Sequence, residues 1–147
     1  MQINASRTVA ASPAKVFGLV SNALEWPLIL RTVESAELLT EGALDMGSRL
    51  RERRLLLGAE VTLESEVIEF AHPHRFRLVV ESSDRSFDRD FIIDALDIGS
   101  RLTLAIRPGS RTSTGRVLLD IVSPVLQIRL SDELEMDIAD FAAALRA

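Results

Sequence analysis

The sequence predicts an α+β fold in which a curved antiparallel sheet of seven strands surrounds a long C-terminal helix, with two short helices after the first strand. Short segments of alternating apolar and polar residues follow one another from residue 33 to residue 107, separated by brief turns. Connections of this length are typical of antiparallel strands. From residue 119 onward, apolar residues recur every three or four positions, which is the period of a helix with one buried side.

The N-terminal part is predicted to contain one strand and then two short helical pieces. The strand covers Ile3–Ala10, where polar and apolar residues partly alternate. Ser12 can accept a hydrogen bond from the first turn of a helix that starts at Pro13. A stop signal follows residue 20, and residues 23–27 form a second short helical turn.

Six further strands complete the predicted sheet. They are Val33–Leu39, Ser48–Leu56, Glu60–Phe70, Phe76–Glu81, Phe87–Leu96 and Leu102–Arg107. A sheet that is hydrophobic on one face must cover that face, and only the C-terminal helix is long enough to do so. We therefore expect the sheet to curl around this helix.

The long helix is predicted from one apolar stripe. Its members are Leu119, Val122, Leu126, Leu130, Leu134, Ile138, Phe141 and Leu145. Four more apolar residues widen the stripe in its first half, namely Leu118, Ile121, Val125 and Ile128. Pro124 removes a backbone donor inside this helix, so we expect a kink or a break near Ile121–Ser123.

Length and composition favour one globular domain that spans residues 1–147. The hydrophobic fraction of 47% and the charged fraction of 27%, with both signs interspersed, are those of an ordinary globular protein. A chain of 147 residues can bury one hydrophobic core. No internal repeat or linker divides it.

Charge and cysteine content exclude several classes of partner. The net charge of -5 disfavours nucleic acids and anionic membrane surfaces. The chain has no cysteine, hence no disulfide framework, thiolate nucleophile or sulfur-rich metal site. It also lacks the apolar run of a secretion signal and the ~20 consecutive apolar residues of a membrane span. We expect a soluble cytoplasmic protein without cofactor or metal.

Several short motifs, in this order and spacing, resemble a known family. They are Ser12-Pro13-Ala14-Lys15-Val16-Phe17, Trp26-Pro27, Gly47-Ser48-Arg49-Leu50-Arg51-Glu52-Arg53-Arg54, Gly58, Glu66-Val67-Ile68-Glu69-Phe70 and Pro73-His74-Arg75. Over nearly the whole chain the sequence resembles the polyketide cyclase/dehydrase branch of the START-like superfamily, also called SRPBCC or Bet v 1-like. The resemblance implies a helix-grip fold with a deep cavity for a hydrophobic ligand such as a lipid or polyketide. Some members are enzymes, and many are carriers.

Two stretches depart from the family pattern. Gly99-Ser100-Arg101 stands where Gly-Thr-Arg is usual before the last strand, which is a conservative change. The apolar stretch Pro27–Leu30 follows Trp26 in place of a polar run, and we expect it to alter the cavity mouth.

No catalytic constellation stands out in the sequence. The chain has neither Cys nor Tyr, and its two histidines, His72 and His74, share one turn. The family resemblance implies that this turn faces solvent between two strands, which argues against a role for the histidines as metal ligands or proton shuttles. Asp88, Asp90 and Asp94 have one parity in a strand, and Phe87, Phe91 and Ile93 have the other. We interpret the three aspartates as the polar outer face of the sheet.

The strand over residues 48–56 leaves one question open. Alternation sends inward either the set Leu50, Glu52 and Arg54 or the set Arg49, Arg51 and Arg53, so ionisable groups face the interior in either case. If Glu52 and Arg54 point inward, they orient the polar end of a ligand or act as catalytic groups. The alternative is that they lie solvated at the rim of the sheet.

The predicted ligand-binding residues are mostly aliphatic. They are Phe17, Val20, Trp26, Leu50, Leu63, Phe76, Leu78, Phe91, Ile93, Leu104, Val122 and Leu126. Trp26, the only tryptophan, is expected either to cover the cavity mouth, with its indole N–H near a ligand, or to anchor the core.

Three functions are compatible with these observations. The leading hypothesis is binding, and possible transport, of a small hydrophobic ligand in an internal cavity. The second is an aromatase/cyclase-like enzyme in which Glu52 and Arg54 assist closure or dehydration of a polyketide. The third is an interaction protein without ligand, which forms a homodimer through an edge strand or the Val117–Ile128 surface.

Overall fold

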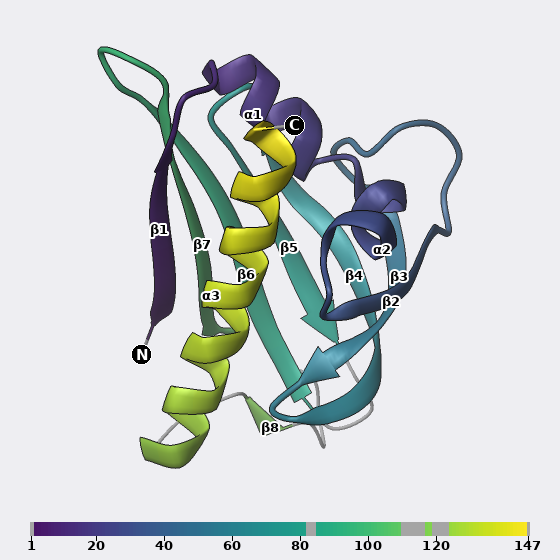
Figure 1. Ribbon diagram of the computed structural model, residues 1–147. Coiled ribbons are helices and arrows are strands. Elements are labelled where there is room, and N and C mark those ends of the chain that lie inside the picture. Colours follow the sequence, from purple (N-terminus) through teal and green to yellow (C-terminus); the bar gives the residue numbers. More distant parts are fainter. Residues whose placement is uncertain (1, 82–84, 110–116, 119–123, 147) are drawn as a thin grey trace.

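The computed structural model describes residues 2–81, 85–109, 117–118 and 124–146 (Figure 1). The strands are β1 (Ile3–Val9), β2 (Val33–Leu38), β3 (Arg49–Leu56), β4 (Ala59–Ala71), β5 (Arg75–Glu81), β6 (Arg85–Ala95), β7 (Ser100–Pro108) and β8 (Val117–Leu118). The helices are α1 (Pro13–Val20), the 3-10 turn η1 (Ala23–Glu25), α2 (Trp26–Ile29) and α3 (Pro124–Arg146). The predicted order of strand, helix pair, six strands and long helix is confirmed.

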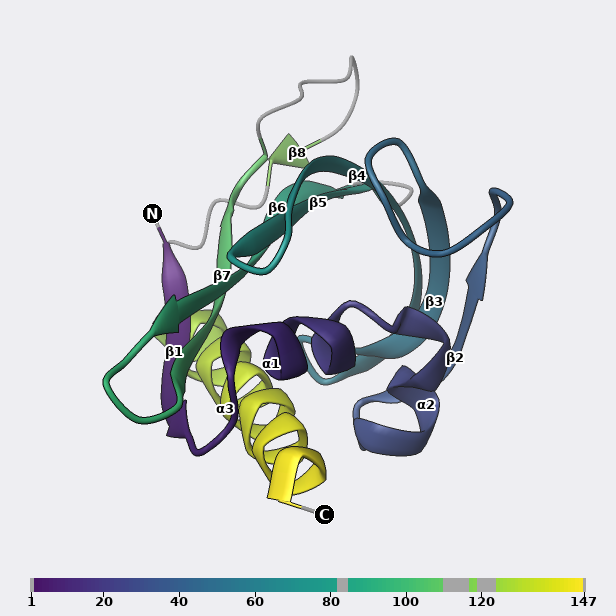
Figure 2. The same cartoon turned by 90° about the horizontal axis from the view of Figure 1, so that it is seen from above.

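Seven strands form one antiparallel path in the order β1-β7-β6-β5-β4-β3-β2, and the short β8 pairs in parallel with β6. The sheet curls strongly, and α3 lies on its concave side next to β1 and β7 (Figure 2). Helix α1 crosses one end of the curled sheet, and α2 packs beside β2. The sheet and α3 therefore enclose the hydrophobic core.

The local signals of the N-terminal helix act as the sequence predicts. The side chain of Ser12 accepts a hydrogen bond from the backbone N–H of Lys15 at 3.3 Å, and Pro13 occupies the first turn. The buried ring of Phe17 packs edge-on against Phe70 and Phe76, with ring centroids 5.1 and 5.6 Å away. These contacts fix α1 over the end of the sheet.

Strand β3 presents the set Leu50, Glu52 and Arg54 to the interior. These three side chains are buried, whereas Arg49, Arg51 and Arg53 are exposed. Leu56, at the other end of the strand, has the same parity as Leu50, and burying both apolar ends also turns the charged residues between them inward.

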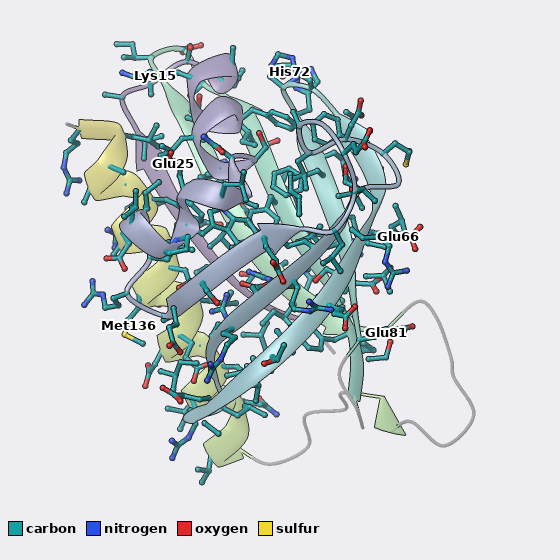
Figure 3. All side chains as sticks on the ribbon, turned by 90° about the vertical axis from the view of Figure 1, so that its right-hand side faces the viewer. Lys15, Glu25, Glu66, His72, Glu81 and Met136 are labelled. Carbon is teal, nitrogen blue, oxygen red and sulfur yellow. The ribbon has the colours of Figure 1, made fainter. Side chains whose placement is uncertain are left out.

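The exposed arginines of β3 belong to the charged outer face of the sheet. Arg49 and Arg51 lie 3.8 and 3.7 Å from Glu64 of β4, and Arg51 also lies 2.9 Å from Glu37 of β2. In Figure 3, Glu66 and Glu81 likewise point away from α3. Ion pairs between neighbouring strands thus cover this part of the outer face.

Helix α3 starts at Pro124, which corrects the predicted helix start. A proline is tolerated in the first turn because its missing N–H has no helical partner there. Leu118, predicted to lie in the helix, instead belongs to β8. Residues 119–123, which include Leu119, Val122 and the expected kink, lie outside the described residues.

The second half of the apolar stripe of α3 is buried, as predicted. Leu130, Leu134, Ile138, Phe141 and Leu145 are buried. The predicted widening of the stripe in its first half is wrong for two residues, because Val125 and Ile128 are 64% and 63% exposed. No helix within the described ranges is both long and apolar enough to span a membrane.

Candidate ligand-binding site

A cluster of charged side chains lies between the sheet and α3. It consists of Glu52 and Arg54 from β3, Arg89 from β6 and Asp137 from α3, all between 1% and 7% exposed. Burial of four ionisable groups is costly unless they are paired. The cluster is therefore held together by ion pairs that reach across the core.

The first pair joins the sheet to the helix. Nη2 of Arg54 donates a hydrogen bond to Oδ2 of Asp137 at 2.9 Å, and Nε of Arg54 donates to the backbone carbonyl of Leu55 at 3.1 Å. The hydroxyl of Thr32 donates to the other carboxylate oxygen of Asp137. Both oxygens of Asp137 thus have partners.

The second pair crosses the concave face of the sheet. Nη1 of Arg89 donates a hydrogen bond to Oε1 of Glu52. The guanidinium carbon of Arg89 lies 5.3 Å from the ring centroid of Trp26 and 5.5 Å from that of Phe91. Both distances are in the range of cation–π attraction, which helps to offset the burial of this cation.

Burial and the neighbouring carboxylates shift the pKa values of Arg54 and Arg89 in opposite directions. Burial disfavours the cation of Arg54, but Asp137 and Glu52 outweigh it and leave the pKa of Arg54 raised. Burial dominates at Arg89, so its pKa is lowered, although Glu52 opposes this shift and the neighbouring Arg54 reinforces it. Guanidinium groups stay protonated in proteins, so both residues remain cations.

Glu133 ties α3 to the hairpin between β3 and β4. Its two carboxylate oxygens accept hydrogen bonds from the backbone N–H groups of Leu57 and Gly58 at 3.0 and 2.9 Å. Leu57 and Gly58 both have positive φ angles, 54° and 80°, as in the tight turns that suit two-residue hairpins. This turn directs both amides at the helix.

A small cavity lies within this cluster. It is lined by Arg54, Leu56, Leu63, Phe87, Arg89, Ile106, Glu133, Leu134 and Asp137. Its volume is about 20 Å³, which is room for roughly one water molecule. The cavity therefore combines apolar walls with two cations and two carboxylates.

Most of the predicted ligand-binding residues fill the core. The ten whose side chains are described are all buried: Phe17, Val20, Trp26, Leu50, Leu63, Phe76, Leu78, Phe91, Ile93 and Leu104. Of these, Leu63 lines the cavity. Three of the others stack on one another, because the ring centroid of Phe91 lies 5.7 Å from that of Trp26 and 4.3 Å from that of Phe76. Val122 and the side chain of Leu126 are not among the described parts of the structure. A ligand-binding role for these twelve residues stays a prediction.

Trp26 is a core residue and does not lie at the cavity mouth. Its side chain is fully buried, and its indole N–H donates to the carbonyl of Val20 at 3.1 Å. Of the two alternatives, these contacts support an anchor in the core, because the nearby end of α1 supplies the acceptor for this N–H.

Two other groups of candidates lie away from the cluster. His72 and His74 are exposed in the turn between β4 and β5. Asp90 has the outward parity of β6 but is buried, at 2% exposure, because Arg77 donates to it at 2.6 Å and Arg107 also donates, and both cover it. Within the described ranges, no group of three His, Cys, Asp or Glu side chains is placed to hold a metal ion.

Three members of the site escaped prediction from sequence: Arg89, Asp137 and Glu133. Arg89 has the same strand parity as Phe87 and Phe91, which is a signal for an inward-facing cation. Asp137 and Glu133 are four residues apart and thus lie on one side of α3, next to the apolar stripe. Their partners on the sheet are distant in sequence.

The chain belongs to the family described as polyketide cyclase / dehydrase and lipid transport, which matches residues 1–136. The predicted family and helix-grip fold are thereby confirmed. This membership suggests binding of a hydrophobic ligand. No curated protein matches the sequence.

Solved structures with the same fold include three from different organisms. A START superfamily protein from Mycobacterium smegmatis is 14% identical, with a TM-score of 0.79 over 99% of this chain and 97% of that one. The Zhui aromatase/cyclase from a Streptomyces species is 17% identical, with a TM-score of 0.78 over 99% and 93%. Ginseng major latex-like protein from Panax ginseng is 13% identical, with a TM-score of 0.76 over 100% and 98%. At such identities the likeness shows the fold alone.

Proposed function

We propose that this protein binds a small hydrophobic ligand between the sheet and α3, at the cavity bordered by Arg54, Arg89 and Asp137. The observation that most directly supports this proposal is that buried charged side chains surround an apolar cavity. Packed apolar residues often give equal or greater stability than buried ion pairs. Stability alone therefore does not account for this cluster, whereas recognition of the polar end of a ligand does.

Ligand binding on this proposal requires the site to open. The cavity of about 20 Å³ is far below the roughly 300–1,000 Å³ of typical small-molecule sites. On the β3 side, α3 is held by the bonds of Asp137 to Arg54 and of Glu133 to the hairpin turn. Separation of α3 from β3 breaks these bonds and enlarges the cavity where its polar groups already lie.

A neutral fluorescent probe tests the proposal. N-phenyl-1-naphthylamine should bind with a saturable increase of its fluorescence emission. Leu134→Trp, whose larger side chain fills the cavity from its wall, should abolish this binding. The matched control is Leu28→Trp, because Leu28 is 83% exposed and far from the cluster in sequence. Probe binding that is absent, or that survives Leu134→Trp in a folded variant, would contradict the proposal.

A cyclase-like enzyme is the second candidate, and the inward orientation of Glu52 and Arg54 favours it. In this role Oε2 of Glu52, which has no hydrogen-bond partner among the described residues, would take the proton next to a carbonyl group, and the guanidiniums of Arg54 and Arg89 would stabilise the resulting enolate. The experiment follows deuterium exchange at the α-carbon of an acetoacetyl thioester by NMR. Catalysed exchange that Glu52→Gln removes would support this activity, and exchange no faster than in buffer would exclude it for this substrate type.

A further inference from the structure

Two buried polar atoms on neighbouring strands have no hydrogen-bond partner among the described residues. They are Oε2 of Glu52 on β3 and Oγ of Ser65 on β4, in residues that are 1% and 3% exposed. Leu50 is opposite Ser65 and Leu63 is opposite Glu52, so Glu52 and Ser65 are diagonal neighbours on the inner face. Diagonal positions are about 7–8 Å apart, within reach of long side chains.

Neither residue lines the cavity, but each is two positions along its strand from a residue that does. Ser65 is two residues from Leu63 on the same face of β4, and Leu63 lines the cavity. Glu52 is two residues from Arg54 on the same face of β3, and Arg54 also lines the cavity. Buried polar groups are almost always paired, and an unpaired one costs free energy. A partner that enters with a ligand would remove that cost.

The charges around Glu52 select the chemistry of this partner. A carboxylate cannot donate a hydrogen bond to Oε2 and is repelled by the charge of Glu52. An ammonium group would lie beside two cations, because Nη1 of Arg54 is 3.6 Å from Oε2 and Arg89 bonds the other oxygen. A neutral hydroxyl donates to Oε2 and accepts from the hydroxyl of Ser65.

We propose that Glu52 and Ser65 form a subsite for a neutral hydroxyl group, so that the preferred ligands are hydrophobic alcohols or phenols. This inference rests on the proposed function, because it assigns the polar end of the ligand bound at the same cavity. It predicts an order of affinity among molecules with one carbon chain and different head groups.

The experiment compares 1-octanol, octanoate and octylammonium by isothermal titration calorimetry on the full chain. Octanol should bind about tenfold more tightly than the two charged compounds. Ser65→Ala should weaken octanol binding about threefold to tenfold, the effect of one hydrogen bond, with little change for the others. The same variant should unfold at the same temperature as the wild type or higher, since its hydroxyl has no partner to lose.

Ser48→Ala is the matched control for stability. Ser48 is buried like Ser65, but its hydroxyl accepts a bond from the N–H of Asp45 at 2.9 Å, so its removal should lower the unfolding temperature. Equal affinities for the three compounds, or unchanged octanol binding by Ser65→Ala, would overturn the hydroxyl subsite and leave the proposed function standing. Binding of none of the three would count against the proposed function itself.

Discussion

Arg54 of β3 and Asp137 of α3 form a buried ion pair, with 2.9 Å between Nη2 and Oδ2, that connects the sheet to the helix at the wall of the cavity. The side chains are only 5% and 3% exposed. The same bond thus contributes to holding α3 against the sheet and to the polarity of the candidate site. On the proposed function, the stability of the fold and ligand binding are therefore coupled.

Removal of Asp137 should destabilise the fold strongly. Asp137→Ala leaves the cation of Arg54 buried without its main partner, which costs roughly 3–5 kcal/mol. Urea denaturation followed by circular dichroism measures the change. Asp132→Ala, at an exposed position of the same helix, should stay within about 0.5 kcal/mol of the wild type. Similar stabilities for the two variants would contradict the described pairing.

The hairpin turn should lose protection when Glu133 loses its charge. Glu133→Gln keeps the size of the side chain but leaves one carboxamide oxygen to accept from the two amides of Leu57 and Gly58. Hydrogen exchange at these amides, followed by NMR, should accelerate by about tenfold. Glu135→Gln, on the exposed side of α3, should leave both exchange rates unchanged.

The contribution of Asp140 to stability should depend on acid pH. The hydrogen bond from Arg31 holds the pKa of Asp140 below its ordinary value of 3.8. A carboxylate with a lowered pKa stabilises the fold fully above its unfolded-state pKa, and this contribution is lost as the pH falls through the folded-state value. The melting temperature of the wild type should therefore exceed that of Asp140→Asn at pH 6, and the difference should shrink below about pH 4. A difference that is constant from pH 6 to pH 3 would contradict the bond.

Two glycines should respond in opposite ways to the same substitution. Gly99 has a φ of 84°, and an added Cβ would overlap the carbonyl oxygen of Val9, so Gly99→Ala should destabilise by more than about 1 kcal/mol. Gly18 lies inside α1 with nothing within 4 Å of an added Cβ, so Gly18→Ala should stabilise by about 0.5–1 kcal/mol. Thermal denaturation of both variants provides the comparison, and a stabilised Gly99→Ala would be inconsistent with this turn.

The fold was largely predictable because its signals are local. The cap at Ser12, the alternation along β1 and β3 and the stripe from Leu130 to Leu145 depend on neighbouring residues and appear in the structure. The start of α3 was not predictable in this way. Pro124 is compatible with a kinked helix or with a first turn, and the periodicity of its neighbours does not distinguish the two.

The candidate site was predicted only in part because its contacts are long-range. Both parities of β3 contain charged residues, so alternation alone left the direction of Glu52 and Arg54 open. Arg54 and Asp137 are 83 positions apart, and Glu52 and Arg89 are 37 apart. Such pairs are set by the curvature of the sheet and the position of α3, which a single sequence does not specify.

Native mass spectrometry of the purified protein, followed by organic extraction, tests the central claim most directly. The account predicts an adduct in the mass range of small molecules on the folded chain, and its release into the organic phase as a hydrophobic compound. Leu134→Trp should yield the bare chain mass from the same host. A wild-type protein that carries no adduct and takes up no hydrophobic compound when these are added in excess would contradict ligand binding between the sheet and α3.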